Sequence, residues 1–306
     1  MQWQTTIDAF LKFLESERSS SVNTVLAYRN DLGQFSEHLV KHARPEGDWS
    51  VITQDYIISY VNSLAERGYT KSTVARKIAA LKTLFSWLKT NAQIAIAPTD
   101  GLKSPRVDKR TPRLLSVDEV ASLINATANV PQPRSARDRA LMEVVYSTGM
   151  RVSEAINLRM GDIDLQTNEV RCLGRANRVR KMPLLPRAAE ALHLYIAKAR
   201  TELMGNIATD YVFLNPQGTK LTRQAVWLMT RQYARNAGIE GDVTPHTLRH
   251  SRAAHMLDNG EDVKRVQEWL GHANLATTQM YQPRVAPKAQ KESRELVVAP
   301  NPPAST

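Results

Sequence analysis

The feature that most constrains the fold is the return of apolar side chains at helical spacing through the first hundred residues. Within residues 7–14, 25–39 and 74–88, apolar positions recur every three or four residues, and a further helix is expected at 54–66. Four amphipathic helices in ~90 residues are typical of a compact helical bundle. The sequence therefore predicts an all-α domain over residues 1–103.

A second domain of mixed character is expected over residues 114–285. Ser116 and Glu119 have the spacing of a capping box at a helix start. The segments Glu169–Gly174 and Arg178–Leu184 alternate like strands and are joined by a short turn, which predicts a β-hairpin. The remaining segments with helical patterns are 135–147, 186–203, 222–237, 245–259, 262–270 and 275–281. The fold class is therefore mainly α, with an α+β second domain that has a small antiparallel sheet.

Residues 104–113, SPRVDKRTPR, are interpreted as a basic linker, because Pro105 and Pro112 interrupt helices and four arginine or lysine side chains add charge. The tail at 286–306 is polar and ends in a proline-rich stretch, so it is expected to be partly disordered.

The chain carries a formal net charge of +11. Such an excess favours a polyanionic partner, most often nucleic acid, although a generally basic protein without such a partner has the same balance. Basic side chains expected to contact DNA lie in one N-terminal helix and in the linker: Lys71, Arg76, Lys77, Arg106, Lys109 and Arg110. The alternative for each is a solvated surface charge.

Cys172 is the only cysteine, so no intramolecular disulfide can form, and it is expected to pack as a small apolar residue. The sequence has no apolar run of ~18 residues and no secretory signal, which predicts a cytoplasmic protein that does not associate with a membrane. It also has no metal-ligand spacing and no phosphate-binding glycine loop, so neither a metal nor another cofactor is expected.

Four short segments concentrate side chains that can act on a phosphate. They are TGMRVSE, HTLRH, LGH and a tyrosine nine residues further on, and they contain Arg151, His246, Arg249, His272 and Tyr281. Each residue taken alone is more often structural, and His250 and His255 are interpreted as structural. Together they supply what metal-free phosphodiester cleavage needs: a nucleophile, bidentate cationic donors and groups that move protons.

The ordered motifs TGMRVSEAINL, TPHTLRHSRAAHML and VQEWLGHANLATTQMY resemble those of the tyrosine recombinase (lambda integrase-like) family, most closely the bacterial Xer enzymes. SVNTVLAYRNDLGQF and TKSTVARKIAALKTLFSWL resemble the core-binding domain of that family, and TDGLKSPR resembles its linker entry. The resemblance implies a SAM-like core-binding domain and a catalytic domain that form a C-shaped clamp around DNA. It also implies strand exchange through a Holliday junction by a homo- or heterotetramer.

The resemblance also implies a role for each matching residue. Arg151 and Arg249 would hold the scissile phosphate, and Glu154 would brace the first arginine. Tyr281 would attack and form a 3′-phosphotyrosine. His246 would assist as an acid or base, and His272 would donate to the phosphate.

The hairpin turn departs from the family pattern. The family places a lysine there, as in GKGNKER, to protonate the leaving 5′ oxygen, whereas this chain reads GRANRVR with Arg175 at the lysine position. A guanidinium with a pKa above ~12 donates hydrogen bonds but gives up a proton poorly. Either Arg175 stabilises the leaving oxygen, another group such as Lys181 protonates it, or cleavage is impaired.

Four interpretations of the function follow from the sequence. The leading one is a Xer-like site-specific recombinase that resolves chromosome or plasmid dimers. The alternatives are a mobile-element or phage integrase, a DNA-binding relative that has lost cleavage, and a type IB topoisomerase-like enzyme.

Overall fold

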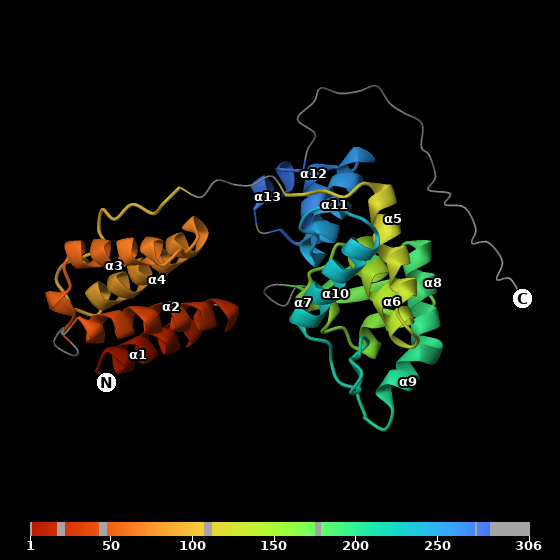
Figure 1. Cartoon of the computed structure of the whole chain (residues 1–306), viewed down its shortest axis with the longest axis horizontal. Helices are drawn as coiled ribbons and strands as arrows, with labels where there is room; N and C mark the ends of the chain where they lie inside the picture. The colour runs from red at the N-terminus through yellow and green to blue at the C-terminus, as the bar shows by residue number, and fades with distance from the viewer. Residues whose placement is uncertain are drawn as a thin grey trace, which may run out of the picture. The chain divides into compact units, whose positions relative to one another are not determined.

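The computed structural model describes residues 2–16, 22–42, 48–106, 112–174, 179–272 and 274–281. The chain divides into two compact units, Met1–Arg110 and Thr111–Thr306 (Figure 1). The division falls inside the segment 104–113 that was expected to be a linker. The turn residue Arg175, the linker residues Lys109 and Arg110, and the tail 286–306 lie outside the described residues.

The first unit is helical, as predicted. Its elements are α1 (Gln2–Ser16), α2 (Val22–Lys41), the short 3-10 helix η1 (Trp49–Val51), α3 (Gln54–Glu66) and α4 (Lys71–Thr90). Thr53 and Thr70 cap α3 and α4, because each side-chain oxygen accepts a hydrogen bond from a backbone N–H in the first turn. α1 packs on α2 and α4, and α3 packs on α4.

Aromatic side chains form much of the core of this first unit. Trp3 meets Trp49 edge to face with ring centroids 4.5 Å apart, and Trp49 meets Phe85 in the same way at 5.7 Å. Phe35 and Tyr60 pack at 5.0 Å. Such edge-to-face pairs add stability beyond the area they bury. The apolar stripes seen in the sequence thus meet in one shared core.

The second unit is built around a helix that is buried on most of its surface. This helix, α6 (Arg134–Thr148), packs against α5 (Val117–Asn125), α7 (Val152–Ala155), α8 (Pro186–Leu194) and α11 (Pro245–Asp258). The predicted capping box at the start of α5 is present. The other elements are η2 (Ala126–Asn129), η3 (Met160–Asp162), the π-helical η5 (Tyr195–Ala199), α9 (Arg200–Met204), α10 (Arg223–Asn236), α12 (Val263–Leu270) and α13 (Leu275–Gln279).

The predicted hairpin is present as β2 (Glu169–Leu173) and β3 (Val179–Pro183), which pair antiparallel from Glu169↔Pro183 to Leu173↔Val179. A two-residue strand, β1 (Ile163–Asp164), pairs with the other edge of β2 and was not predicted. The fold class inferred from the sequence, a helical domain followed by an α+β domain with a small antiparallel sheet, is therefore confirmed.

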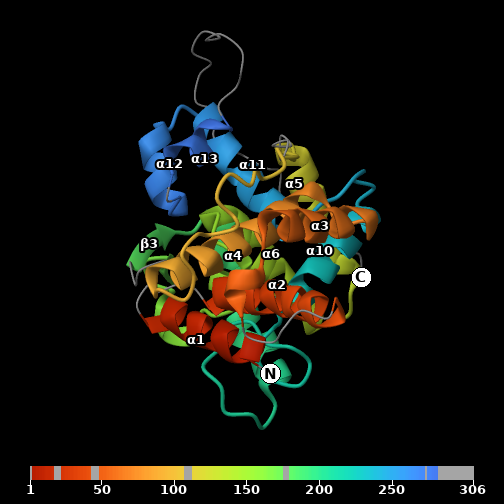
Figure 2. The ribbon, with the colours of Figure 1, turned by 90° about the vertical axis from the view of Figure 1, so that its left-hand side faces the viewer.

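Two sharp turns determine where the C-terminal helices of the second unit lie. Gly149 ends α6 with a φ of 62°, and Gly271 ends α12 with a φ of 64°, both in the left-handed region that glycine tolerates. Figures 1 and 2 both draw α12 and α13 beside α11, in agreement with the contacts between these helices. The turn after α6 and the turn after α12 carry the backbone oxygens of the site described below.

Among the described residues, no helix has the length and apolar character needed to cross a membrane. The same described ranges contain no cluster of three or more histidine, cysteine or acidic side chains arranged to hold a metal ion.

Candidate active site

The side chain of Arg249 is buried, with 4% of the residue exposed, in the second turn of α11. Its Nη1 donates to the carbonyl oxygen of Gly149 at 2.5 Å, and its Nη2 donates to that of Leu270 at 2.7 Å. Burial, followed by the positive charge of Arg151, lowers the pKa of Arg249 to about 10. The guanidinium is therefore still charged near neutral pH, and it is held by the ends of α6 and α12.

Arg151 immediately precedes α7 and lies close to Arg249. Its Nη1 donates to Glu154 Oε1 at 2.9 Å, and its Nη2 donates to the Gly271 carbonyl oxygen at 3.0 Å. The backbone N–H of Arg151 also donates to Glu154 Oε2, at 2.7 Å. Glu154 thus fixes both the backbone and the side chain of this arginine, while the Arg151 side chain stays 31% exposed.

A third arginine, Arg180 on β3, completes what we call the cationic cluster (Arg151, Arg180 and Arg249). Its Nη2 donates to Glu154 Oε1 at 3.1 Å and its Nη1 to the Trp269 carbonyl oxygen at 2.9 Å. Arg180 was not among the residues that the sequence predicted for the site. The pairing of the two strands could have indicated it, because Arg180 pairs with the buried Cys172 and therefore lies on the inner face of the hairpin.

The free thiol of Cys172 is buried beneath this cluster, as expected of a small apolar residue. Burial, together with the negative charge of Glu154, raises the pKa of the thiol to about 11. Cys172 therefore remains a neutral packing residue and is not a candidate nucleophile.

His246 and His272 are the two histidines that the sequence predicted for the site. His246 is exposed on α11, yet partial loss of hydration and the charges of Arg249 and Arg151 lower its pKa. His272 is half-buried, and its Nδ1 is 2.8 Å from Thr278 Oγ1. Burial, reinforced by Arg249 and Arg151, lowers the pKa of His272 to about 4. Near neutral pH both imidazoles are therefore neutral.

Tyr281 follows α13 and is buried, with 5% exposed, in a small cluster that includes Met256 and Leu270. Its hydroxyl hydrogen-bonds to Nδ1 of His250. The centroid of the Tyr281 ring lies 5.3 Å from that of His250 and 6.3 Å from that of His272. Burial raises the pKa of the Tyr281 hydroxyl, and the charge of Arg249 opposes this shift.

His250 is the residue of this site that sequence analysis interpreted as structural. The available signal was helical spacing, because His250 is four residues after His246 and hence on the same face of α11. The two imidazole rings stack with centroids 6.2 Å apart. The geometry therefore adds His250 to the residues around Tyr281.

The charges of this site suit an anion. The carboxylate of Glu154 forms ion pairs with Arg151 and Arg180 and acts on Arg249 through its charge, so one negative group stands against three positive ones and the local balance is positive. Neutral histidines nearby can donate a hydrogen bond or exchange a proton. A tyrosine hydroxyl beside such a cluster is a combination that suits phosphoryl transfer without a metal.

Some basic residues predicted to contact DNA lie differently from what was expected. Lys77 is buried, with 2% exposed, and its Nζ donates to Asp31 at 2.9 Å and to Gln34 at 2.8 Å. An ammonium held in this way supports the packing of α2 against α4 and does not face a phosphate. Arg76 also pairs with Asp31 but remains 41% exposed. Lys71 and Arg106 are exposed.

Lys181, the alternative proton donor, is exposed on β3 and pairs with Arg171. Neighbouring residues of a strand point to opposite faces, so Lys181 points away from the face on which Arg180 reaches Glu154. This position argues against Lys181 as the donor to a leaving oxygen.

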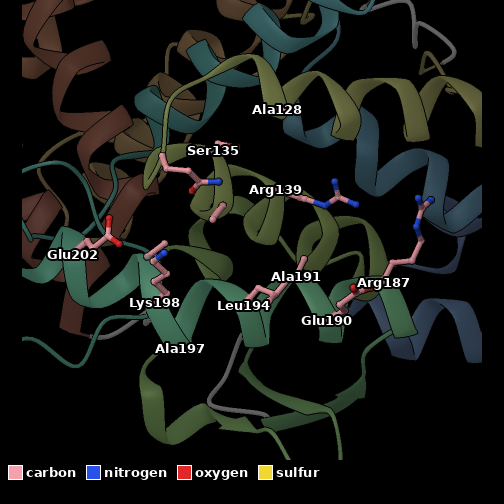
Figure 3. Close-up of a pocket in the computed structure, with 13 residues that line it drawn as sticks. Ala128, Ser135, Arg139, Arg187, Glu190, Ala191, Leu194, Ala197, Lys198 and Glu202 are labelled. Carbon is pink, nitrogen blue, oxygen red and sulfur yellow. The ribbon is translucent and has the colours of Figure 1, made fainter. Parts of the chain in front are cut away.

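A separate pocket lies between α6 and the α8–η5–α9 segment (Figure 3). Its charged lining residues include Arg139, Arg187, Glu190 and Lys198, among small side chains such as Ala191. None of the residues that line it belongs to the cationic cluster or contacts Tyr281. The chemistry described above is therefore not located in this pocket.

Comparison with known proteins gives the family. The phage integrase family matches residues 113–286, and the phage integrase N-terminal SAM-like domain matches residues 7–91. The chain is 42% identical over 278 residues to the tyrosine recombinase XerC of Herpetosiphon aurantiacus, covering 91% of this chain and 90% of that one. It is 40% identical over 280 residues to the tyrosine recombinase XerD of Halalkalibacterium halodurans, covering 90% and 91%.

Among solved structures, the XerH site-specific recombinase bound to a palindromic difH substrate in a post-cleavage complex has a similar fold. The TM-score is 0.71 at 22% identity, and the match covers 90% of this chain and 80% of that chain. The chain therefore belongs to the phage integrase family, as a tyrosine site-specific recombinase that acts on DNA and is similar to the Xer enzymes. The relatives favour this function over a mobile-element integrase or an impaired DNA-binding protein.

Proposed function

We propose that Tyr281 is the nucleophile that cuts the DNA strand. Its oxygen attacks the scissile phosphorus and forms a 3′-phosphotyrosyl bond, while the bond from phosphorus to the 5′ oxygen breaks and releases a 5′-hydroxyl. The observation that carries the proposal is the burial of the Tyr281 hydroxyl against His250, close enough to Arg249 for that charge to act on its pKa. Rejoining is the reverse reaction, with the 5′-hydroxyl as the attacking group.

Arg151 and Arg249 bind the non-bridging oxygens of the phosphate in this proposal. A guanidinium has five N–H donors, so the two that hold backbone carbonyls on Arg249 leave others for a phosphate. Negative charge grows on these oxygens in the transition state, and fixed cations stabilise it without reorganisation. Glu154 positions Arg151 through its side chain and its backbone N–H.

His246 and His272 assist as neutral imidazoles, His246 in proton transfer and His272 as a donor to the phosphate. Arg175 stands at the lysine position of the family pattern, and we propose that it donates a hydrogen bond to the leaving 5′ oxygen. The chemistry of an arginine predicts slower protonation of that oxygen than a lysine would give.

The substrate is a double-stranded recombination site, and we propose a tetramer as the active assembly. Exchange between two duplexes cuts four strands, and each chain contributes one Tyr281, so four protomers supply the four nucleophiles. The relatives named XerC and XerD leave open a homotetramer or a heterotetramer. The reaction passes through a Holliday junction intermediate. The biological role is the resolution of chromosome or plasmid dimers.

The two units divide this work. We propose that residues 1–103 form the core-binding domain, 104–113 the linker, 114–285 the catalytic domain and 286–306 the tail. Lys71, Arg76, Arg106, Lys109 and Arg110 contact phosphates, and each neutralised phosphate contributes to salt-dependent affinity. The buried ion pair of Lys77 with Asp31 removes Lys77 from this set.

A covalent trapping experiment tests the proposal. The binding site is first selected from a pool of random duplexes with the whole protein, and a nicked half-site is then built from it so that the cut fragment diffuses away. Wild-type protein is expected to form a protein–DNA adduct that survives denaturation, and Tyr281→Phe is expected to form none. Wild-type protein that binds the selected site but gives no adduct refutes the proposed chemistry.

A further inference from the structure

The Tyr281 hydroxyl has one polar partner close to it on α11, the Nδ1 atom of His250. The ring centroids are 5.3 Å apart and the ring planes are inclined by 38°. Tyr281 is buried and His250 is half-buried, so little water surrounds the hydrogen bond. A tyrosine that becomes a nucleophile has to lose its proton, and the group already bonded to that proton is placed to receive it.

The neighbouring groups of the site are less suited to this task. His272 holds Thr278 Oγ1 with its Nδ1 atom, and its ring is 6.3 Å from that of Tyr281. Arg249 is charged and has no lone pair for a proton. His246 stacks on His250 with ring centroids 6.2 Å apart, so it is His250 and not His246 that lies next to the Tyr281 hydroxyl.

We propose that His250 is a catalytic residue that accepts the proton of Tyr281 during strand cleavage and returns it during rejoining. The proposal rests on the function of Tyr281 proposed above. As the Tyr281 oxygen bonds to phosphorus, its O–H bond breaks and the proton passes to Nδ1 of His250. The bond from phosphorus to the 5′ oxygen breaks at the same time, and this oxygen takes a proton from solvent water. In rejoining both protons go back.

The charges around His250 favour the form that this role needs. Burial, followed by the charges of His246 and Arg249, lowers the pKa of His250 to about 4, so the imidazole is neutral and its lone pair is available. A bound phosphate adds negative charge to the site and raises the proton affinity of the ring. The ionisable groups that act on the pair are His246, Arg249 and His272, and the charges of Arg151 and Arg180 act in turn on Arg249 and His272.

The test measures single-turnover formation of the covalent adduct by His250→Ala and His250→Gln on the nicked half-site. Glutamine can still hold the Tyr281 hydroxyl through its amide oxygen but cannot take a proton. Both variants are expected to cleave about 100-fold more slowly than wild type. His255→Ala is the matched control, since His255 lies on the same helix and bonds to Tyr146. It is expected to cleave at the wild-type rate.

Two further measurements separate proton transfer from a structural effect. With a 5′-bridging phosphorothiolate, the leaving thiolate needs no proton, so the defect of His250→Ala is expected to persist. The rate of adduct formation by His250→Ala is also expected to rise about tenfold per pH unit between about pH 7 and pH 9, because this variant depends on Tyr281 that is already ionised. The rate of wild-type protein is expected to be nearly flat over this range.

Three results overturn the inference: a His250→Gln variant as fast as wild type, recovery of His250→Ala on the phosphorothiolate, or a defect of His250→Ala that stays constant with pH. These results differ from failure of the proposed function, in which wild-type protein itself forms no adduct. Affinity for the selected duplex and thermal unfolding of each variant show that it folds and binds.

Discussion

Replacing Glu154 by glutamine tests what holds the cationic cluster together. The amide oxygen of glutamine still accepts from Arg151 and Arg180, but the amide nitrogen then faces the Arg151 backbone N–H, which donates to Oε2 at 2.7 Å in the native chain. The substitution therefore loses one hydrogen bond and the negative charge that two guanidinium groups share.

The structure sets the size of this loss. A hydrogen bond to a charged group contributes about 1.5–3 kcal/mol. The ion pair with Arg180 has side chains 15% and 9% exposed and keeps most of its strength, whereas the 31% exposure of Arg151 reduces its share through solvent screening. We expect Glu154→Gln to lower the free energy of unfolding of the second unit by about 3 kcal/mol.

Thermal unfolding of the full chain measures this effect. At about 2–4 °C per kcal/mol for a unit of this size, the transition of the second unit is expected to fall by about 6–12 °C. Glu240→Gln, at an exposed position, removes the same charge and is expected to leave the transition in place. Adduct formation by Glu154→Gln is expected to fall about 10- to 100-fold, because Arg151 loses its orientation. A transition within about 2 °C of wild type would refute the idea that Glu154 supports the cluster.

Three other outcomes are expected. Gly149→Ala places a Cβ 2.5 Å from Leu270 Cδ2 at a φ of 62°. Urea unfolding should therefore show that the free energy of unfolding falls by about 2–5 kcal/mol. A fall of less than about 1 kcal/mol would contradict the close packing at this turn. Lys71→Ala is expected to reduce the slope of log affinity for the selected duplex against log salt by about 0.9, while Lys77→Met changes thermal stability and not this slope. His250 and His272 have pKa values of about 4 in the folded chain against 6.5 in an unperturbed histidine, so the unfolded chain binds more protons between these pH values. The free energy of unfolding is therefore expected to fall as the pH drops from about 6.5 towards 4. When this free energy is measured by urea unfolding and plotted against pH, the slope for His272→Gln should be smaller than that of wild type by about 1.4 kcal/mol per pH unit.

Periodicity predicted the helices and the hairpin because their apolar faces are local properties of the chain. The predicted helices 135–147 and 262–270 are present as α6, which has Gly149 as its C-cap, and α12, which has Asp262 as its N-cap. The strand β1 escaped prediction because two residues, Ile163 and Asp164, are too few to show an alternating pattern.

The site was harder to predict because its contacts join distant segments. Arg180 reaches a carboxylate 26 positions away in sequence, and Arg249 holds a carbonyl 100 positions away. Lys77 illustrates the opposite error: its sequence context on a basic helix suggested an exposed face, but the carboxylate of Asp31 on another helix draws it into the core. A charge pattern in the sequence predicts the sign of the surface charge, but packing decides which of the charged side chains are exposed.

The end of α12 explains how three arginines can lie together before any phosphate arrives. Trp269, Leu270 and Gly271 are consecutive, and their carbonyl oxygens accept from Arg180, Arg249 and Arg151 respectively. The last carbonyls of a helix have no partner within it and carry its negative dipole end, so cationic donors satisfy them at low cost. The guanidinium groups are thus held by backbone oxygens and by Glu154, and the proposed binding of a phosphate would need no movement of these donors. Because His272 directly follows these carbonyls and Tyr281 shares a buried cluster with Leu270, the same helix end that positions the cations also sets where Tyr281 lies.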